Sequence, residues 1–190
     1  MSRLETVLAE IDAANARDPN IGADGRPAEL VYGERMSEEL ERRFPAASDA
    51  LRIAARGQHV ERWLIPREGY PDGRVGYLAW RTELGRMHAR RVAGFMAAAG
   101  YDAETCDHVA RMLRKEGIKR DADTQALEDV ICFVFLRWYF ADFTVKHADE
   151  DLERIVERTA RKMSPEGRAA ALAEFDMPEA FASKFAAAAP

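Results

Sequence analysis

Cysteine and long apolar runs are scarce in this sequence, and each shortage excludes certain classes of protein. The two cysteines, Cys106 and Cys132, lie too far apart to form a metal-binding pair, and so few cysteines are typical of a reduced cytosolic protein. The most apolar run, residues 130–140, is too short to cross a bilayer and contains Arg137. The opening MSRLETVLAEIDAA is too acidic for a signal peptide. We therefore predict a cytoplasmic protein with no membrane partner.

Strand patterns and glycine-rich phosphate loops are missing as well. No stretch alternates polar and apolar residues between turns, and neither the Rossmann nor the P-loop glycine pattern occurs. Apolar residues recur instead at helical spacings of three and four along most of the chain. The sequence of 190 residues predicts one all-α domain, residues 1–190, with six to eight helices.

The stretch from residue 124 to residue 146, TQALEDVICFVFLRWYFADFTVK, is expected to be the central helix. Its middle, residues 130–140, is apolar everywhere except at Arg137, and a helix that is apolar all round must be buried on all sides. Two acids, Glu128 and Asp129, stand at its start. Acids entering a buried helix need a cap, an ion pair or a metal.

Two segments are expected to fall outside the helices. Residues 18–36 contain two prolines and three glycines and are predicted to form an extended wrapping arm. The apolar residues of this arm fit packing on its own domain or, in a homodimer, on a second copy. Residues 181–190 are rich in alanine and are predicted to form a frayed tail.

Arginine is concentrated in one window although the whole chain carries a net charge of −5. The overall charge argues against general nucleic-acid binding. Residues 52–91 nevertheless carry nine arginines against four acids, and arginine forks suit phosphate and carboxylate groups. Most of these arginines are explained as solvated helix faces. The candidates for substrate binding are Arg56, Arg62, Arg67 and Arg81.

Two of the four histidines lie inside this arginine-rich window. A helix predicted from residue 48 to about residue 64 carries His59, and the next long helix, predicted over residues 77–99, carries His88. Because one loop joins these helices, the two histidines are expected to converge. With Asp129 they would form a metal set suited to Zn, Mn, Fe or Mg, although each histidine alone is more often structural.

Several segments of the chain resemble one family. The segments are DPN, PAELVYGERM, AARGQHVERW, IPREGYPDGRVGYLAWR, MHA and QALEDVICFVFLRWYFADF. Together they resemble the bacterial and fungal family called domain of unknown function 4202, and the similarity covers nearly the whole chain. The family brings no established activity with it.

A more distant likeness is to the HD superfamily of helical metal-dependent phosphohydrolases. The stretch DADTQALEDVICFVFL is similar to the end of the HD pattern, with Asp129 as its late aspartate. The resemblance implies His59 and His88 as the earlier histidines. The His-Asp doublet of that pattern is absent, because Val60 follows His59 and Ala89 follows His88.

The first hypothesis is a metal-dependent, HD-like hydrolase acting on a phosphorylated small molecule or nucleotide. His59, His88 and Asp129 would hold the divalent metal, which would activate a water molecule. Glu128 and Glu61 are the candidate catalytic carboxylates. The arginines would hold phosphate oxygens.

Two alternatives remain open from the sequence. In the first, the protein binds an anionic ligand, a nucleotide or RNA, through the arginine-rich residues 52–91 and does not convert it; nucleic acid is the less favoured ligand. In the second, the protein is a carboxylate-bridged di-iron oxidase, but the sequence lacks the two Glu-x-x-His pairs that such a site needs.

Overall fold

The computed structural model describes residues 1–146 and 149–187, in which every regular element is a helix and there is no strand. The all-α prediction is confirmed. The described residues form ten α-helices, more than the six to eight predicted. The chain divides into two compact units, residues 1–117 and 118–190, each treated separately below, and the single domain predicted over residues 1–190 stays a prediction. None of the helices described is both long and apolar enough to span a membrane.

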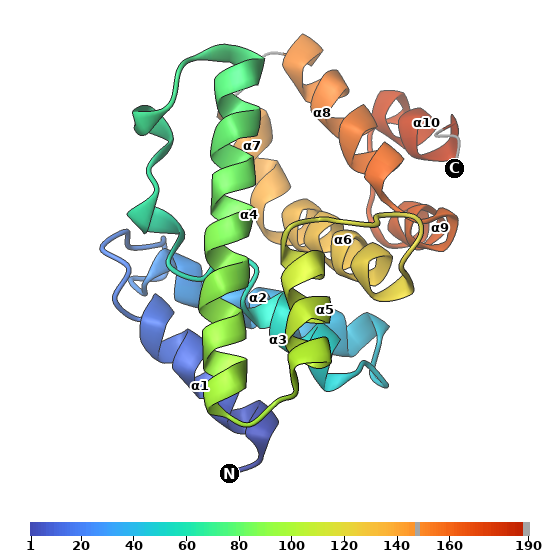
Figure 1. Cartoon of the computed structure of the whole chain (residues 1–190). Coiled ribbons are helices and arrows are strands. Elements are labelled where there is room, and N and C mark those ends of the chain that lie inside the picture. Colours follow the sequence, from blue (N-terminus) through green and yellow to red (C-terminus); the bar gives the residue numbers. More distant parts are fainter. Residues whose placement is uncertain (147–148, 188–190) are drawn as a thin grey trace. The chain divides into compact units, whose positions relative to one another are not determined.

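The first unit is built on the long helix α4 (Gly73–Ala98), which packs on α1 (Arg3–Asn15) and α5 (Ala103–Leu113), as Figure 1 shows. The short helix α3 (Asp49–Arg56) packs on α1, α5 and α2 (Ala28–Arg43). Apolar side chains spaced for one helix face meet in this core. Those exposed by 2% or less are Val7, Ile11, Ala14, Met36, Leu40, Ile53, Ala54, Ala55, Val60, Leu84, Val92, Met96, Val109, Met112 and Leu113.

Helix α2 corrects the predicted arm. Only residues 18–27 run as a loop, whereas residues 28–36 are helical. The cap of this helix comes from outside it, because the Asp18 carboxylate accepts the Glu29 backbone N–H at 3.0 Å. Gly33 lies inside the helix, where a Cβ would stand 3.1 Å from the Arg56 carbonyl oxygen. This glycine permits close approach of α2 and α3 rather than a turn.

Helix α3 ends at Arg56, earlier than the predicted residue 64. Residues 57–61 form turns, and a 3₁₀ segment, Arg62–Leu64, follows. Glu61 adopts the left-handed region, with φ 52°, and its backbone N–H donates to Asn15 Oδ1 at 2.9 Å. Because the helix stops at Arg56, His59 lies in the turn that follows α3 and not on the helix that the sequence had predicted for it. Its side chain is therefore not held on one helix face with that of Arg56.

The segment before α4 is attached to the first unit at several points. The Arg67 guanidinium donates to the carbonyl oxygens of Tyr70 and Pro71, each at 2.9 Å, and Trp80 Nε1 donates to the Ile65 carbonyl oxygen at 2.8 Å. Gly76 packs so closely on Pro71 that a Cβ would overlap the Pro71 carbonyl oxygen. Arg67, predicted to bind substrate, thus shapes this segment.

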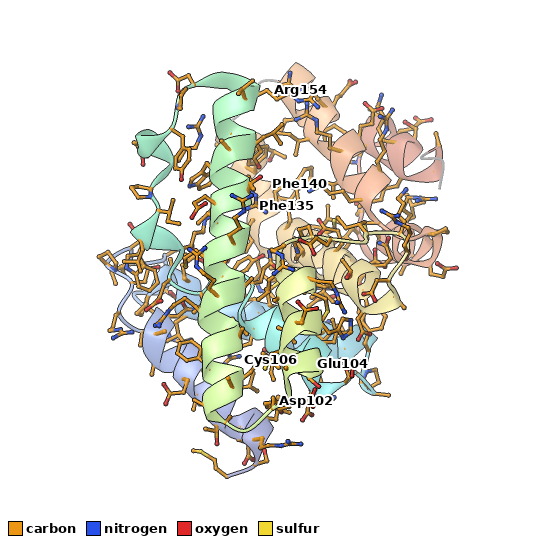
Figure 2. The ribbon with its side chains drawn as sticks, in the orientation of Figure 1. Asp102, Glu104, Cys106, Phe135, Phe140 and Arg154 are labelled. Atoms are coloured by element: carbon orange, nitrogen blue, oxygen red, sulfur yellow. The ribbon has the colours of Figure 1, made fainter. Side chains whose placement is uncertain are left out.

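The second unit contains α6 (Ala122–Val134), a π-helical turn (Phe135–Tyr139), α7 (Phe140–Lys146), α8 (Asp149–Lys162), α9 (Pro165–Glu174) and α10 (Glu179–Ala187). α8 packs on α6 and α10, and α9 on α10. Phe135 and Phe140, labelled in Figure 2, meet edge to face with ring centroids 5.7 Å apart. The buried core of this unit comprises Cys132, Phe133, Leu136, Val156, Ala160, Met163, Ala171 and Phe185.

Two predictions on this unit need correction. The stretch 124–146 is helical, but it is not buried on all sides, because Ala141 and Asp142 are exposed and Val145 is 86% exposed. Residues 181–187 belong to α10, and Phe185 is buried, whereas residues 188–190 of the predicted tail lie outside the described residues. Phe185 anchors the alanine-rich end in the core, which composition alone did not indicate.

Candidate functional site

A pocket of about 310 Å³ opens in the first unit between the turn after α3, the middle of α4 and the end of α5. Both His59 and His88 line it, together with Arg81. Its other lining residues are Gln58, Leu78, Thr82, Leu84, Gly85, Arg86, Leu113, Arg114, Lys115 and Glu116. Four cationic side chains against one carboxylate make this pocket electropositive.

The turn that carries His59 is held by contacts from distant parts of the unit. Glu61 is buried, and its carboxylate accepts hydrogen bonds from Arg91 Nε at 2.5 Å and Arg17 Nη2 at 3.1 Å. Its left-handed backbone costs on the order of 1–3 kcal/mol, which these contacts offset. Glu61, predicted as a catalytic carboxylate, does not line the pocket and instead fixes the turn.

The His59 ring is fully engaged. Arg62 Nη1, which can only donate, lies 2.9 Å from His59 Nε2, so the ring proton sits on Nδ1 and is donated to Glu29 Oε2 at 3.1 Å. Tyr32 of α2 stacks on the ring, with centroids 3.9 Å apart. Burial first, and then the charge of Arg62, lowers the pKa of His59 well below its ordinary value. His59 is therefore neutral at pH 7.

His88 is 4% exposed and its centroid lies 6.2 Å from that of His59. The two histidines thus lie near each other, as their places in the sequence predicted. The Val60 carbonyl oxygen lies 2.8 Å from His88 Nδ1, which therefore carries the proton. Burial lowers the pKa of His88 to about 3, although the hydrogen bond to Val60 raises it, and this ring is neutral as well.

The predicted substrate-binding arginines occupy different environments. Arg81 lines the pocket, and no hydrogen bond or ion pair joins it to another residue of the described chain. Arg62 supports the pocket from behind through His59, with its guanidinium 5.0 Å from the centroid of the Trp80 ring. Arg56 forms a two-pronged ion pair with Asp12, at 2.6 and 2.7 Å, and so joins α3 to α1. Of this set, only Arg81 faces the pocket.

Glu128 and Asp129 belong to the second unit, where both have local contacts. Lys162 Nζ lies 3.5 Å from Glu128 Oε1. The Asp129 carboxylate accepts hydrogen bonds from the Ser164 backbone N–H at 2.8 Å, from the Ser164 hydroxyl at 2.5 Å and from Gln125 Nε2 at 3.1 Å. Ser164 in turn caps α9, so Asp129 stabilises the start of that helix.

No group of three or more His, Cys, Asp and Glu side chains in residues 1–146 and 149–187 is placed to hold a metal ion. His59 also has both ring nitrogens engaged, and a metal at Nε2 would have to displace Arg62. The His, Cys, Asp and Glu side chains of the described residues therefore do not offer three protein ligands to one metal ion. The predicted Mn, Fe, Zn or Mg site stays a prediction, and we derive no step through it.

Sequence reasoning missed the contribution of α5. Arg114 and Lys115 follow one another at its C-terminal end, and Lys115 Nζ donates to Gln58 Oε1 at 3.0 Å. Lys115 has φ 62°, a left-handed conformation that is uncommon for lysine. The sequence did contain a basic pair at the end of a helix. Such a pair does not by itself indicate a binding site, because cations at a helix C-terminus are also stabilised by the helix dipole.

A half-buried acid beside His59, Glu29, makes stability depend on pH. Burial raises the pKa of Glu29 from its ordinary value of 4.5 to about 7, although the charge of Arg62 lowers it. The folded state then holds a proton that the unfolded chain releases, so the stability contributed by the neutral carboxyl is lost as pH rises from about 4.5 through about 7.

We expect Glu29→Gln to remove this dependence. The free energy of unfolding of the wild type, relative to the variant, should fall by up to about 3 kcal/mol between pH 4.5 and pH 7 and then stay level. Urea unfolding at pH 5, 6, 7 and 8 measures the difference. Parallel stability curves for the two proteins would contradict the raised pKa of Glu29.

Comparison with known proteins places the chain in a family. Residues 5–183 match the family described as Domain of unknown function (DUF4202), and the chain belongs to it. No curated protein and no solved structure matches the chain.

Proposed function

We propose that this member of the DUF4202 family binds a small phosphorylated molecule in the pocket formed by residues 58–59, α4 and the end of α5. The observation that carries the proposal is Arg81. It is a half-buried guanidinium that lines a pocket and has no hydrogen-bond or ion-pair partner within the described part of the chain. Arginine forks are suited to oxyanions, and a bound phosphate would supply the missing partner.

The other pocket residues support an anionic ligand. Arg86, Arg114 and Lys115 add positive charge, and Glu116, the one acid in the lining, is paired with Arg114 at 2.7 Å. The two histidines contribute polar atoms without contributing charge. A phosphate monoester carries close to two negative charges at pH 7, which matches this charge balance better than a single carboxylate does.

The size of the pocket favours a small molecule over RNA. A volume of about 310 Å³ lies at the lower end of the range for small-molecule pockets. RNA recognition generally uses broad basic surfaces with aromatic platforms. This chain carries a net charge of −5, and four of its basic side chains line one concave site. A small phosphorylated metabolite would also agree with the predicted cytoplasmic location.

Calorimetric titration tests the proposal. Glucose 6-phosphate, glycerol 3-phosphate and adenosine monophosphate are compared with glucose, glycerol and adenosine. We expect at least one phosphorylated compound to bind at least tenfold tighter than its uncharged counterpart, and its affinity to weaken between 0.05 and 0.5 M salt because screening reduces charge attraction. If no phosphorylated compound exceeds its counterpart, the proposal is wrong.

The same titration separates binding from metal-dependent hydrolysis. We expect the affinity to be equal in EDTA and in added Mn²⁺, because Arg81 and its neighbours supply the positive charge. Release of inorganic phosphate in Mn²⁺ alone, abolished in both His59→Ala and His88→Ala, would instead support the hydrolase predicted from the sequence. Metal content of the purified protein, measured by mass spectrometry, provides an independent check.

A further inference from the structure

His88 presents one accessible hydrogen-bond acceptor to the pocket. Its Nδ1 donates to the Val60 carbonyl oxygen at 2.8 Å, and this bond fixes the neutral tautomer in which Nε2 carries a lone pair. Val60 is fully buried at the end of the turn fixed by Glu61, so the carbonyl oxygen has a set position. His88 therefore meets the pocket as an acceptor rather than as a donor.

Within residues 1–146 and 149–187, no hydrogen bond joins His88 Nε2 to another residue. The side chain is only 4% exposed, but Nε2 is not among the fully buried, unpaired side-chain atoms of the described residues, so this nitrogen is reached from the pocket that His88 lines. The neighbouring ring cannot serve as the donor, because the one ring proton of His59 is donated to Glu29. The missing donor is therefore expected to come from outside the protein, from whatever occupies the pocket.

Arg81 and His88 lie seven residues apart on α4, two turns along one face of the helix. Two turns span about 10.5 Å along the helix axis, and both side chains line the same pocket. A ligand that satisfies both needs an anionic group for Arg81 and a hydrogen-bond donor several bonds away for His88. A hydroxyl on the carbon skeleton of a phosphate ester has this arrangement.

We propose that the ligand of this pocket is a phosphorylated polyol, whose phosphate binds Arg81 and whose hydroxyl donates a hydrogen bond to His88 Nε2. The inference rests on the proposed phosphate-binding function and adds its specificity. The class includes sugar phosphates and the ribose phosphate of a nucleotide, and it excludes simple alkyl phosphates. The hydroxyl keeps its proton, and no bond is made or broken.

A matched pair of probes tests this specificity. Glycerol 3-phosphate and n-propyl phosphate have the same charge and the same number of carbons, and they differ in two hydroxyls. For the wild type we expect glycerol 3-phosphate to bind about tenfold tighter, because a site built to bond a hydroxyl rejects a ligand that lacks one. In His88→Phe the preference should vanish, while the affinity for n-propyl phosphate stays within about twofold.

A second measurement needs no variant, in case His88→Phe fails to fold. The ¹⁵N resonance of His88 Nε2 should move from the position of a free lone pair toward that of a hydrogen-bonded nitrogen on addition of glycerol 3-phosphate, and stay in place with n-propyl phosphate. Equal binding of the two probes, with no ¹⁵N shift, would overturn the polyol inference and leave phosphate binding intact. If neither probe binds, both the inference and the proposed function for these esters fail.

Discussion

Replacing Arg81 with methionine is expected to weaken the binding of a phosphorylated ligand by about 10- to 100-fold. Hydrogen bonds to a charged group contribute about 1.5–3 kcal/mol, and methionine keeps much of the length of the side chain while removing every donor. Arg81→Lys should recover part of the loss, because lysine keeps the charge but not the fork. Isothermal titration with the tightest-binding phosphate ester measures the change.

Arg90→Met is the matched control for this variant. Arg90 lies on the same helix and is exposed, and its guanidinium stands 3.6 Å from Glu83, away from the pocket lining. We expect its replacement to change the affinity by less than twofold. Equal losses in the two variants would mean that the general charge of α4, rather than Arg81, attracts the ligand.

Arg81→Met should leave the free energy of unfolding nearly unchanged. Arg81 makes no hydrogen bond or ion pair with the described residues, so its loss removes no intramolecular contact of that kind. Burial lowers the pKa of Arg62, and the charge of Arg81 lowers it further by repulsion, so removing Arg81 relieves that repulsion. A binding defect without a stability defect distinguishes Arg81 from Arg56, whose removal would break the ion pair with Asp12.

Asp129→Ala is expected to lower the free energy of unfolding of the second unit by about 3 kcal/mol. Three donors lose their acceptor at once, two of them on Ser164 at the start of α9. Gly167 lies against the same carboxylate, at about 2.9 Å from an ideal Cβ position, so the site is closely packed. Burial raises the pKa of Asp129, which shows that desolvation offsets part of the gain from these bonds.

Hydrogen exchange of the α9 amides and urea unfolding together measure this effect, and they locate it in the second unit. Asp142→Ala, an exposed aspartate on α7, serves as the control and should change stability by no more than about 0.5 kcal/mol. Unchanged α9 exchange in Asp129→Ala, together with loss of bound Mn, Fe or Zn, would contradict the capping role and return Asp129 to the predicted metal site.

Local signals in the sequence predicted most of the helices. Ser48, at the start of the helix predicted from residue 48, caps α3 by accepting the backbone N–H group of Leu51, and Asp102 caps α5 by accepting that of Thr105. Figure 2 labels Asp102 at the start of α5. The first half of α2, residues 28–36, was missed because its first turn is capped by Asp18, ten residues before the helix begins, and no local pattern reveals such a partner.

The pocket could be predicted only in part, for a similar reason. The connection between two helices indicated that His59 and His88 lie close together, and their ring centroids are 6.2 Å apart. Composition could not separate the nine arginines of residues 52–91, because each has the same chemistry until its partner is known. Arg56 has Asp12 and Arg67 has two carbonyl oxygens, whereas Arg81 has none among the described residues. The spacing of residues along a helix does not predict these partners.

The π-helical turn at residues 135–139 sets the direction in which the side chains of α7 point. A π turn adds one residue to the circuit, so residues from Phe140 onward are rotated by about 100° from where a regular α-helix would place them. Phe140 and Phe143 thereby both reach the ring of Phe135, at 5.7 Å. Removing one residue from this turn would leave composition almost untouched, yet it would point the aromatic side chains of α7 in another direction.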